Sequence, residues 1–349
     1  MKKIVLAASA AAVLQVLAMP VGDGVADDTA EIQKMLDAKG LISLEAPGAC
    51  YRISRSLRIG SDTELRLASD ARVLLAPGSD CPLLVNADIT NGNARITVWG
   101  GIWDMDNTRQ APNPGWAHLA TPPQPQRRCN PRGDYEPTRY RGNAFYFENV
   151  QGLRFGGASI RNPVTYAFQM CRVCDFTVDG VTFDFTTENP IKGNMDGIHL
   201  DGGCHRGRIA NIRGTCWDDM VAINADDGIC AAHKEEISDV VIENLHSDYC
   251  HSAVRLLSAP HPVRRIRIRN VTGRFYQYAV GFTHYFPERP QGVIEDITIE
   301  HVRVCKVPPP DGIPGFQPDG GLPTIFFDAR LTCNRVTFDD VTVLPPESK

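Results

Sequence analysis

Hydrophobic and polar residues alternate with a period of two in short runs along most of the chain. Residues 65–67, 95–98, 153–155 and 176–178 are examples. Alternation over so few residues predicts half-buried β-strands, because successive side chains of a strand point to opposite faces. We therefore expect an all-β protein with many short strands and polar turns between them.

One segment near the N-terminus has a helical spacing instead. Ile32, Met35 and Leu36 fall on one helical face, and Gly40 follows as a stop signal. Asp28 precedes this segment, and Glu31 lies three residues after it, which is the spacing of a capping box. The pattern predicts a short amphipathic helix that caps the fold.

A longer repeat of the form apolar-x-apolar-x-x-apolar recurs in the second half of the chain. Its equivalent core positions are spaced by 23, 31, 33, 26, 31 and 39 residues: Phe155, Val178, Ile209, Ile242, Ile268, Ile299 and Phe338. A period of this size indicates a solenoid. Because the strands have no helix between them, we expect a right-handed parallel β-helix, in which each coil stacks on the last. A sandwich or barrel is the alternative, but it would not keep one register over seven units.

A second strand follows the first at a constant distance of twelve residues in three successive coils. The coil before them has an offset of twenty, from Val178 to Ile198, which fits if residues 186–193 are an inserted loop of eight. Together these offsets predict an inward stack of four apolar side chains: Ile198, Val221, Val254 and Val280. Alternation then predicts an outward column of His199, Ala222, Arg255 and Gly281. The next column contains Asp201, Asn224, Leu257 and Thr283.

Composition bounds the compartment and the partners. The 349 residues are 43% hydrophobic and carry a net charge of −5, which argues against a nucleic-acid partner. Residues 1–18 are a basic start and an apolar run, which predicts a signal peptide and a secreted or periplasmic protein. A buried first strand is the alternative. No later stretch is long and apolar enough for a membrane span. We expect residues 19–349 to form one β-helix domain, and the sequence does not indicate its oligomeric state.

Three carboxylates fall on two segments with the same local pattern, an acidic turn before an apolar strand. Asp196 precedes the strand at Ile198, and Asp218 and Asp219 precede the strand at Val221. If the two strands are neighbours, the three carboxylates converge. Like charges that close are unfavourable unless a site uses them, and glycoside hydrolysis uses paired carboxylates.

These segments resemble glycoside hydrolase family 28, the polygalacturonases, within the pectate-lyase-like β-helix superfamily. Residues 194–197, Asn-Met-Asp-Gly, resemble the family's Asn-Thr-Asp-Gly, and residues 218–224 resemble its Asp-Asp-Cys-Ile-Ala-Ile-Asn. Residues 22–33 resemble the superfamily's N-terminal cap. His251 stands near the place of the family's Gly-His-Gly histidine, with Cys250 and Ser252 in place of the glycines.

The resemblance implies an inverting hydrolase without a cofactor or metal, acting on a carbohydrate. Asp218 would be the general acid, Asp196 and Asp219 would hold and deprotonate the water, and His251 would position or tune the acid. Asn194 belongs to the first motif. His199 is expected to point outward beside the acids, and it is either a substrate contact or a solvated surface residue.

The chain departs from the family where the substrate carboxylate would bind. The family's Arg-Ile-Lys is replaced by a strand with Gly281 and Thr283 in the two cationic positions. Arg255 lies one coil earlier in the same outward column. Either Arg255 binds the carboxylate, or the substrate is not a galacturonan, in which case His284 and Tyr285 could contact a neutral sugar.

Two other function classes remain open. A polysaccharide lyase would use calcium, held by carboxylates such as Asp196, Asp201, Asp218 and Asp219, and Arg255 as the base. A non-catalytic carbohydrate-binding solenoid would use the aspartates as turn residues. Two long insertions, 104–141 and 307–323, are expected to be walls or lids of a binding groove.

Overall fold

The computed structural model describes residues 19–113, 142–185, 193–226, 233–308 and 322–345. The expected signal segment 1–18 and most of both long insertions lie outside these ranges. Among the described residues, no helix is long and apolar enough to cross a membrane.

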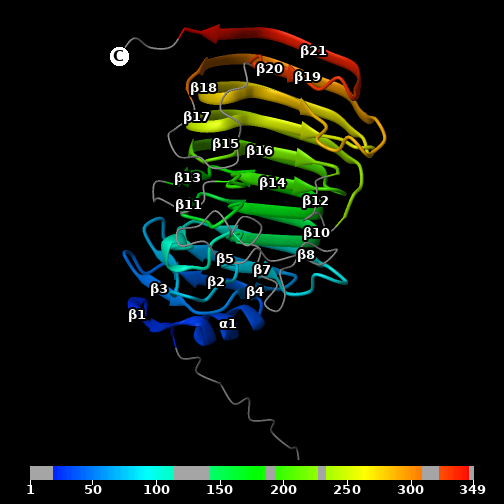
Figure 1. Ribbon diagram of the computed structural model, residues 1–349. Helices are drawn as coiled ribbons and strands as arrows, with labels where there is room; N and C mark the ends of the chain where they lie inside the picture. Colours follow the sequence, from blue (N-terminus) through cyan, green and yellow to red (C-terminus); the bar gives the residue numbers. More distant parts are fainter. Residues whose placement is uncertain (1–18, 114–141, 186–192, 227–232, 309–321, 346–349) are drawn as a thin grey trace, which may run out of the picture.

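The described chain is built almost wholly from strands, which stack in parallel from the N-terminal helix to the C-terminal end (Figure 1). The elements are β1 (Asp23–Asp27), α1 (Thr29–Asp37), β2 (Gly40–Leu44), β3 (Cys50–Ile53), β4 (Leu57–Ile59), β5 (Thr63–Leu67), β6 (Arg72–Leu75), β7 (Leu84–Asn86), β8 (Asn93–Trp99), β9 (Ile102–Asp104), the 3-10 helix η1 (Asn107–Arg109), β10 (Phe145–Gly156), β11 (Ser159–Arg161), β12 (Phe168–Asp179), β13 (Thr182–Asp184), β14 (Ile198–Asp201), β15 (His205–Thr215), β16 (Asp219–Asn224), β17 (Ile237–Leu257), β18 (Val263–Thr283), β19 (Gly292–Lys306), β20 (Ile325–Phe327) and β21 (Leu331–Leu344).

Pairing between the strands is parallel and divides the solenoid into three faces. The first face runs β2, β5, β8, the ends of β10 and β12, and the first parts of β15, β17, β18, β19 and β21. The second runs β1, β3, β6, β9, β11, β13, the ends of β15, β19 and β21, and the middle of β17 and β18. The third, called here the site face, contains β4, β7, the starts of β10 and β12, then β14, β16, the ends of β17 and β18, and β20.

The core columns confirm the register expected from the apolar repeat. On the first face, each predicted position pairs with the next, from Phe155 with Val178 to Ile299 with Phe338. On the site face, Ile198, Val221, Val254 and Val280 pair in succession, and all four are fully buried. The twelve-residue offset therefore predicted the geometry that positions the acids.

The helix forms where expected, but its predicted capping box does not. Ile32 and Leu36 on α1 are buried against the first coil. The Asp28 carboxylate accepts the backbone N–H groups of Val21 and Gly22 at 2.5 and 3.1 Å instead of capping α1. The Asp28 backbone N–H, which Glu31 was expected to take, donates to the carbonyl of Arg52.

A ladder of alternating Asp and Arg lines the corner that leads into the first face. These residues have left-handed backbone with φ between 50 and 61°, and we call them the Asp/Arg ladder: Asp62, Arg95, Asp175, Arg206, Asp239, Arg265, Asp296 and Arg335. Each Arg contacts the Asp of the preceding coil, at 2.5 Å for Arg95 and 2.6 Å for Arg265. Aspartate tolerates this backbone, and the charge pairs satisfy one another between coils.

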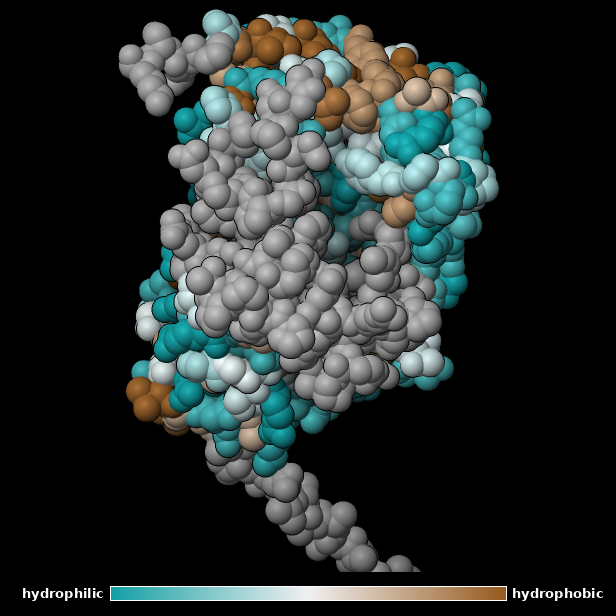
Figure 2. Space-filling model, in the orientation of Figure 1, coloured by the Kyte–Doolittle hydropathy of each residue, from teal (hydrophilic) through white to brown (hydrophobic). Residues whose placement is uncertain are grey.

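The last coil among the described residues exposes apolar surface. Figure 2 shows hydrophobic residues gathered at the end of the solenoid where β21 lies. The exposed apolar residues there are Phe327, Phe338, Val343 and Leu344.

Candidate active site

Asp196, Asp218 and Asp219 lie at the edge where β14 and β16 begin on the site face. Ile198 pairs with Val221, and the Gly197 N–H donates to the Asp219 carbonyl at 2.9 Å. Neighbouring strands are about 4.8 Å apart, so Asp196 lies directly beside Asp219. A Cβ on Gly197 would lie 2.4 Å from the Phe183 ring, which explains the glycine of this motif.

All three carboxyl groups are buried, and two of them are shifted toward the protonated form. Asp218 is 4% exposed, and burial together with the charges of Asp196 and Asp219 raises its pKa well above the usual range. Burial also raises the pKa of Asp196, although a hydrogen bond with His199 acts against this. A carboxyl that stays protonated near neutral pH can act as a general acid.

Asp219 is shifted in the opposite direction. Burial alone would raise its pKa, but Arg255, whose Nε lies 2.5 Å from Asp219 Oδ2, lowers it. Contacts with His251 and the Ser252 hydroxyl act in the same sense, and the net pKa is below the usual value. Two adjacent carboxylates, Asp218 and Asp219, are therefore separated into a proton holder and an ionised group.

His251 bridges these two carboxylates from the next coil. Its Nδ1 lies 3.2 Å from Asp219 Oδ1 and 3.6 Å from Asp218 Oδ1. The ring packs edge-on against Tyr276 and Tyr278, and the backbone N–H of His251 donates to the Asp218 carbonyl. His251 therefore lies in contact with both carboxyl groups, Asp218 and Asp219.

The space expected for the missing cations is filled by an aromatic side chain. Arg255 pairs with Gly281 as predicted. A Cβ at Gly281 would lie 2.3 Å from the Tyr278 ring, so no larger side chain fits while Tyr278 keeps this position. Thr283 is buried and its hydroxyl donates to the Leu256 carbonyl at 3.3 Å.

Tyr285 and His284 occupy different environments. Tyr285 is 47% exposed, its ring lies 5.6 Å from the Arg255 guanidinium carbon, and its hydroxyl is 3.1 Å from that of Tyr278. His284 is buried, and its Nε2 contacts the Pro290 carbonyl at 2.8 Å, so it supports the following loop. Tyr285 is thus the one of the two that reaches the surface beside Arg255.

His199 is not a solvated surface residue, which corrects one of the two possibilities left open by the sequence. It is 1% exposed and stacks on Tyr166, with ring centroids 4.0 Å apart. Its Nδ1 lies 2.6 Å from Asp196 Oδ2. Asn194, two residues before Asp196, is half-buried with a left-handed φ of 56°, which asparagine accepts more readily than most residues.

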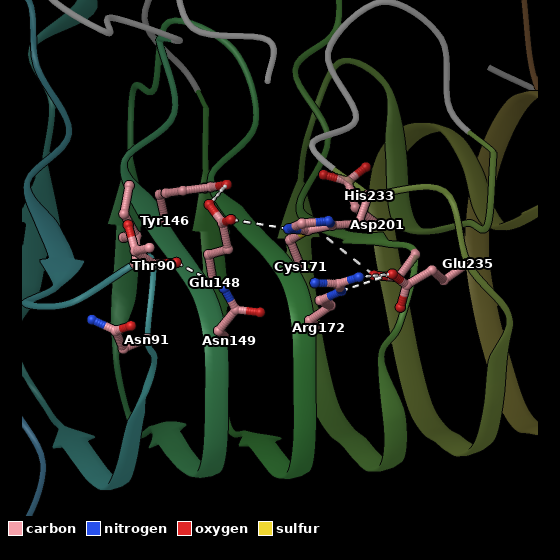
Figure 3. A network of polar contacts seen from close by, with 12 residues as sticks. Thr90, Asn91, Tyr146, Glu148, Asn149, Cys171, Arg172, Asp201, His233 and Glu235 are labelled. Carbon is pink, nitrogen blue, oxygen red and sulfur yellow. Dashed lines mark hydrogen bonds and ion pairs between the residues drawn. The ribbon is translucent and has the colours of Figure 1, made fainter. Parts of the chain in front are cut away.

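Sequence reasoning missed several polar residues on the coils before the acids. Gln169 pairs with His199 and donates to Asp201, which is fully buried and not a plain turn residue. One coil earlier, on β10, the buried Glu148 accepts a hydrogen bond from the Tyr146 hydroxyl and contacts His233 at 3.0 Å (Figure 3). Extending the outward column back across the insertion at 186–193 would have placed Gln169 beside His199.

A metal ion could be held by Asp218, Asp219 and His251, whose ligand atoms lie within 4.8 Å of one another. Among the described residues, these three side chains form the group whose acidic and histidine ligand atoms lie close enough together to hold an ion. The guanidinium of Arg255 already supplies a positive charge at Asp219. The donor set therefore favours an acid–base pair over a cation site, and it differs from the four aspartates expected for calcium.

Comparison with known proteins identifies the fold of the chain. No protein-family profile matches the chain, and no curated protein matches its sequence. An endo-xylogalacturonan hydrolase from Aspergillus tubingensis superposes with a TM-score of 0.59 at 14% identity, over 95% of this chain and 93% of that one. An exopolygalacturonase from Thermotoga maritima gives a TM-score of 0.60 at 14% identity, over 90% and 73%. PfbA, a surface adhesin of Streptococcus pneumoniae, gives 0.54 at 14%, over 93% and 89%. The chain therefore has the right-handed parallel β-helix fold of these proteins.

Proposed function

We propose that the protein is a secreted or periplasmic glycoside hydrolase that cleaves a polysaccharide or oligosaccharide with inversion. Asp218 gives its proton to the glycosidic oxygen as the bond from that oxygen to the anomeric carbon breaks. Asp196 and Asp219 hold a water, which attacks from the opposite side and loses a proton to one of them. His251 positions the two adjacent carboxylates.

The observation that carries this proposal is geometric: three buried carboxyl groups lie together, and Asp219 is the one that contacts the Arg255 guanidinium at 2.5 Å and the His251 ring at 3.2 Å. Adjacent carboxyl groups whose pKa values are pushed apart form an acid and a base at one pH. Burial and like charge hold the proton on Asp218, whereas Arg255 and His251 keep Asp219 ionised. Turn aspartates of a purely structural solenoid have no reason to be buried as a cluster of three.

The substrate unit at the acids is proposed to be neutral, or at least not an unmodified galacturonate. The Tyr278 ring fills the place above Gly281, and Arg255 is in contact with Asp219. A guanidinium that neutralises a catalytic carboxylate is less available to a substrate carboxylate. Tyr285, exposed beside Arg255, offers an apolar ring face to a sugar.

The experiment is product analysis of the purified protein on a panel of neutral and acidic plant and algal polysaccharides. The proposal expects new reducing ends without unsaturation, with neutral or substituted chains cleaved better than polygalacturonate. Unsaturated uronate products would establish the lyase alternative. Binding without any product would favour an adhesive solenoid, as in PfbA, and efficient cleavage of polygalacturonate would contradict the proposed substrate.

A further inference from the structure

Two cysteine side chains meet in the core directly beside the acidic segment. Cys216 lies in the turn between β15 and β16, two residues before Asp218. Cys250 lies in β17 on the next coil, immediately before His251. The two Sγ atoms are 3.2 Å apart, and both side chains are fully buried.

The backbone of the two coils is placed for a covalent bond between these sulfur atoms. Thr215 pairs with Tyr249, and each cysteine is the next residue along its chain segment. Neighbouring parallel strands are about 4.8 Å apart, and disulfides join Cα atoms about 4.4–6.8 Å apart. Because an S–S bond is about 2.05 Å long, the sulfur atoms at 3.2 Å need to approach by only about 1 Å. Rotation of the two side chains can supply a movement of this size.

Other uses of the pair fit the surroundings less well. Both cysteines are free thiols in this structure, and among the described cysteines theirs is the direct Sγ–Sγ contact that is found. The described group that could hold a metal ion consists of Asp218, Asp219 and His251 and includes neither thiol. A thiol that reacts in the folded protein is partly exposed and has a low pKa, whereas burial raises the pKa of Cys216 well above its usual range.

We propose that Cys216 and Cys250 form a structural disulfide when the protein folds in an oxidising compartment. The two thiols lose two protons and two electrons as the S–S bond forms. A protein disulfide or a low-molecular-weight disulfide accepts them and is reduced to two thiols. This exchange precedes closure of the coils, because both sulfur atoms are buried in the folded protein. The bond ties the turn that carries Asp218 to the strand that carries His251.

The test is mass spectrometry of the full-length protein, exported to the periplasm of a bacterial host, where disulfides form. Free thiols are blocked with N-ethylmaleimide under denaturing conditions before digestion. Trypsin together with a protease that cleaves before aspartate separates Cys216 from Cys230. We expect residues 214–217 linked to residues 248–255, and the two peptides released by reduction. Recovery of both Cys216 and Cys250 as maleimide adducts overturns the proposal.

Urea unfolding with and without dithiothreitol gives a second measurement of the same bond. Reduction should lower the unfolding midpoint of the parent, since the disulfide constrains an unfolded chain between cysteines 34 positions apart. In Cys250→Ala, dithiothreitol should leave the midpoint where it is. An unchanged midpoint in the reduced parent, or an equal response in Cys250→Ala, contradicts the cross-link.

Cys204→Ala is the matched control. Cys204 is also fully buried, and its Sγ lies 3.7 Å from the Met170 carbonyl oxygen. This variant should keep both the linked peptides and the response to dithiothreitol, and loss of either would contradict the assigned pair. The cross-link does not rest on the proposed hydrolase function. If the parent cleaves no glycan, that function fails, and the mass spectrum still decides the pairing.

Discussion

Arg255 sets the charge state of the site more directly than any other single side chain. It contacts Asp219, lowers the pKa of that carboxyl and opposes the raised pKa of Asp218. In this structure the guanidinium therefore favours the ionised form of Asp219. Substrate binding by Arg255 stays a prediction.

Replacing Arg255 with methionine should move the acid limb of the kcat/KM profile to higher pH. Without the cation, Asp219 protonates more easily, so the ionised base is lost earlier as pH falls. Arg255→Lys keeps a charge and should move the limb less. A pH–rate series on the best substrate of the panel measures both, and an unmoved limb in the methionine variant would refute the assigned role.

Gly281→Ala should destabilise the protein, since the added Cβ would lie 2.3 Å from the Tyr278 ring. Overpacking of this kind costs about 1–3 kcal/mol. In a Tyr278→Ala background the same change should cost almost nothing, because the ring is absent. Urea unfolding of the four proteins of this double-mutant cycle measures the coupling, and equal costs in both backgrounds would show that Tyr278 does not occupy the site of the missing cation.

At the scale of the elements, the Asp/Arg ladder holds neighbouring coils together with paired charges. Arg265 and a hydrogen bond from Ser238 lower the pKa of Asp239 to about 2, below the usual 3.8 of an aspartate. A carboxyl whose pKa is lower in the folded state stabilises that state above its unfolded pKa, and this contribution disappears as pH falls through about 2.

Asp239→Asn should therefore lower the free energy of unfolding at neutral pH, and this effect should fade as the pH falls below about 2. Both side chains of the pair are over a third exposed, so the loss should stay below about 1 kcal/mol. Asparagine accepts the left-handed φ of 60° at this position, so the backbone is unaffected. Arg265→Gln is the control, in which the same substitution should have a smaller effect, because the cation is gone and the Ser238 hydrogen bond remains.

Residue patterns predicted the columns of the solenoid but not what covers them. Alternation shows which way a side chain points, and the twelve-residue offset placed His199, Arg255 and Gly281 in one column correctly. Burial of His199 depends on Tyr166, and the filled space at Gly281 depends on the rotamer of Tyr278. The pattern of apolar residues predicts neither contact.

The ladder could have been found from the sequence, since its members lie three residues before the core positions from Val178 to Phe338, as Asp239 does before Ile242. The alternation of Asp and Arg becomes visible only when the coils are aligned in register. The capping box failed for a different reason. Tertiary contacts with Val21 and Arg52 use the Asp28 groups that a local helix cap would need.

At the scale of the molecule, a coil in the middle of the solenoid packs between two neighbours, whereas the last coil among the described residues packs on the one before it. Ile268 lies mid-solenoid and is fully buried, whereas Phe338 in the same column is 43% exposed. Ile268→Ala should cost about 2–5 kcal/mol, and Phe338→Ala distinctly less despite the larger side chain. Urea midpoints compare the two, and a greater loss at Phe338 would mean that the C-terminal end is covered in solution.

The proposed hydrolase mechanism depends on Asp218 as the proton donor, and one measurement tests this role most directly. The turnover of Asp218→Asn is compared with that of the parent on the best substrate, with folding of both checked by circular dichroism and thermal unfolding. Asparagine keeps the shape of the buried side chain and cannot give up a proton to the leaving oxygen. The account predicts a loss of ~10²-fold or more at unchanged folding. Turnover at the parent rate would contradict it.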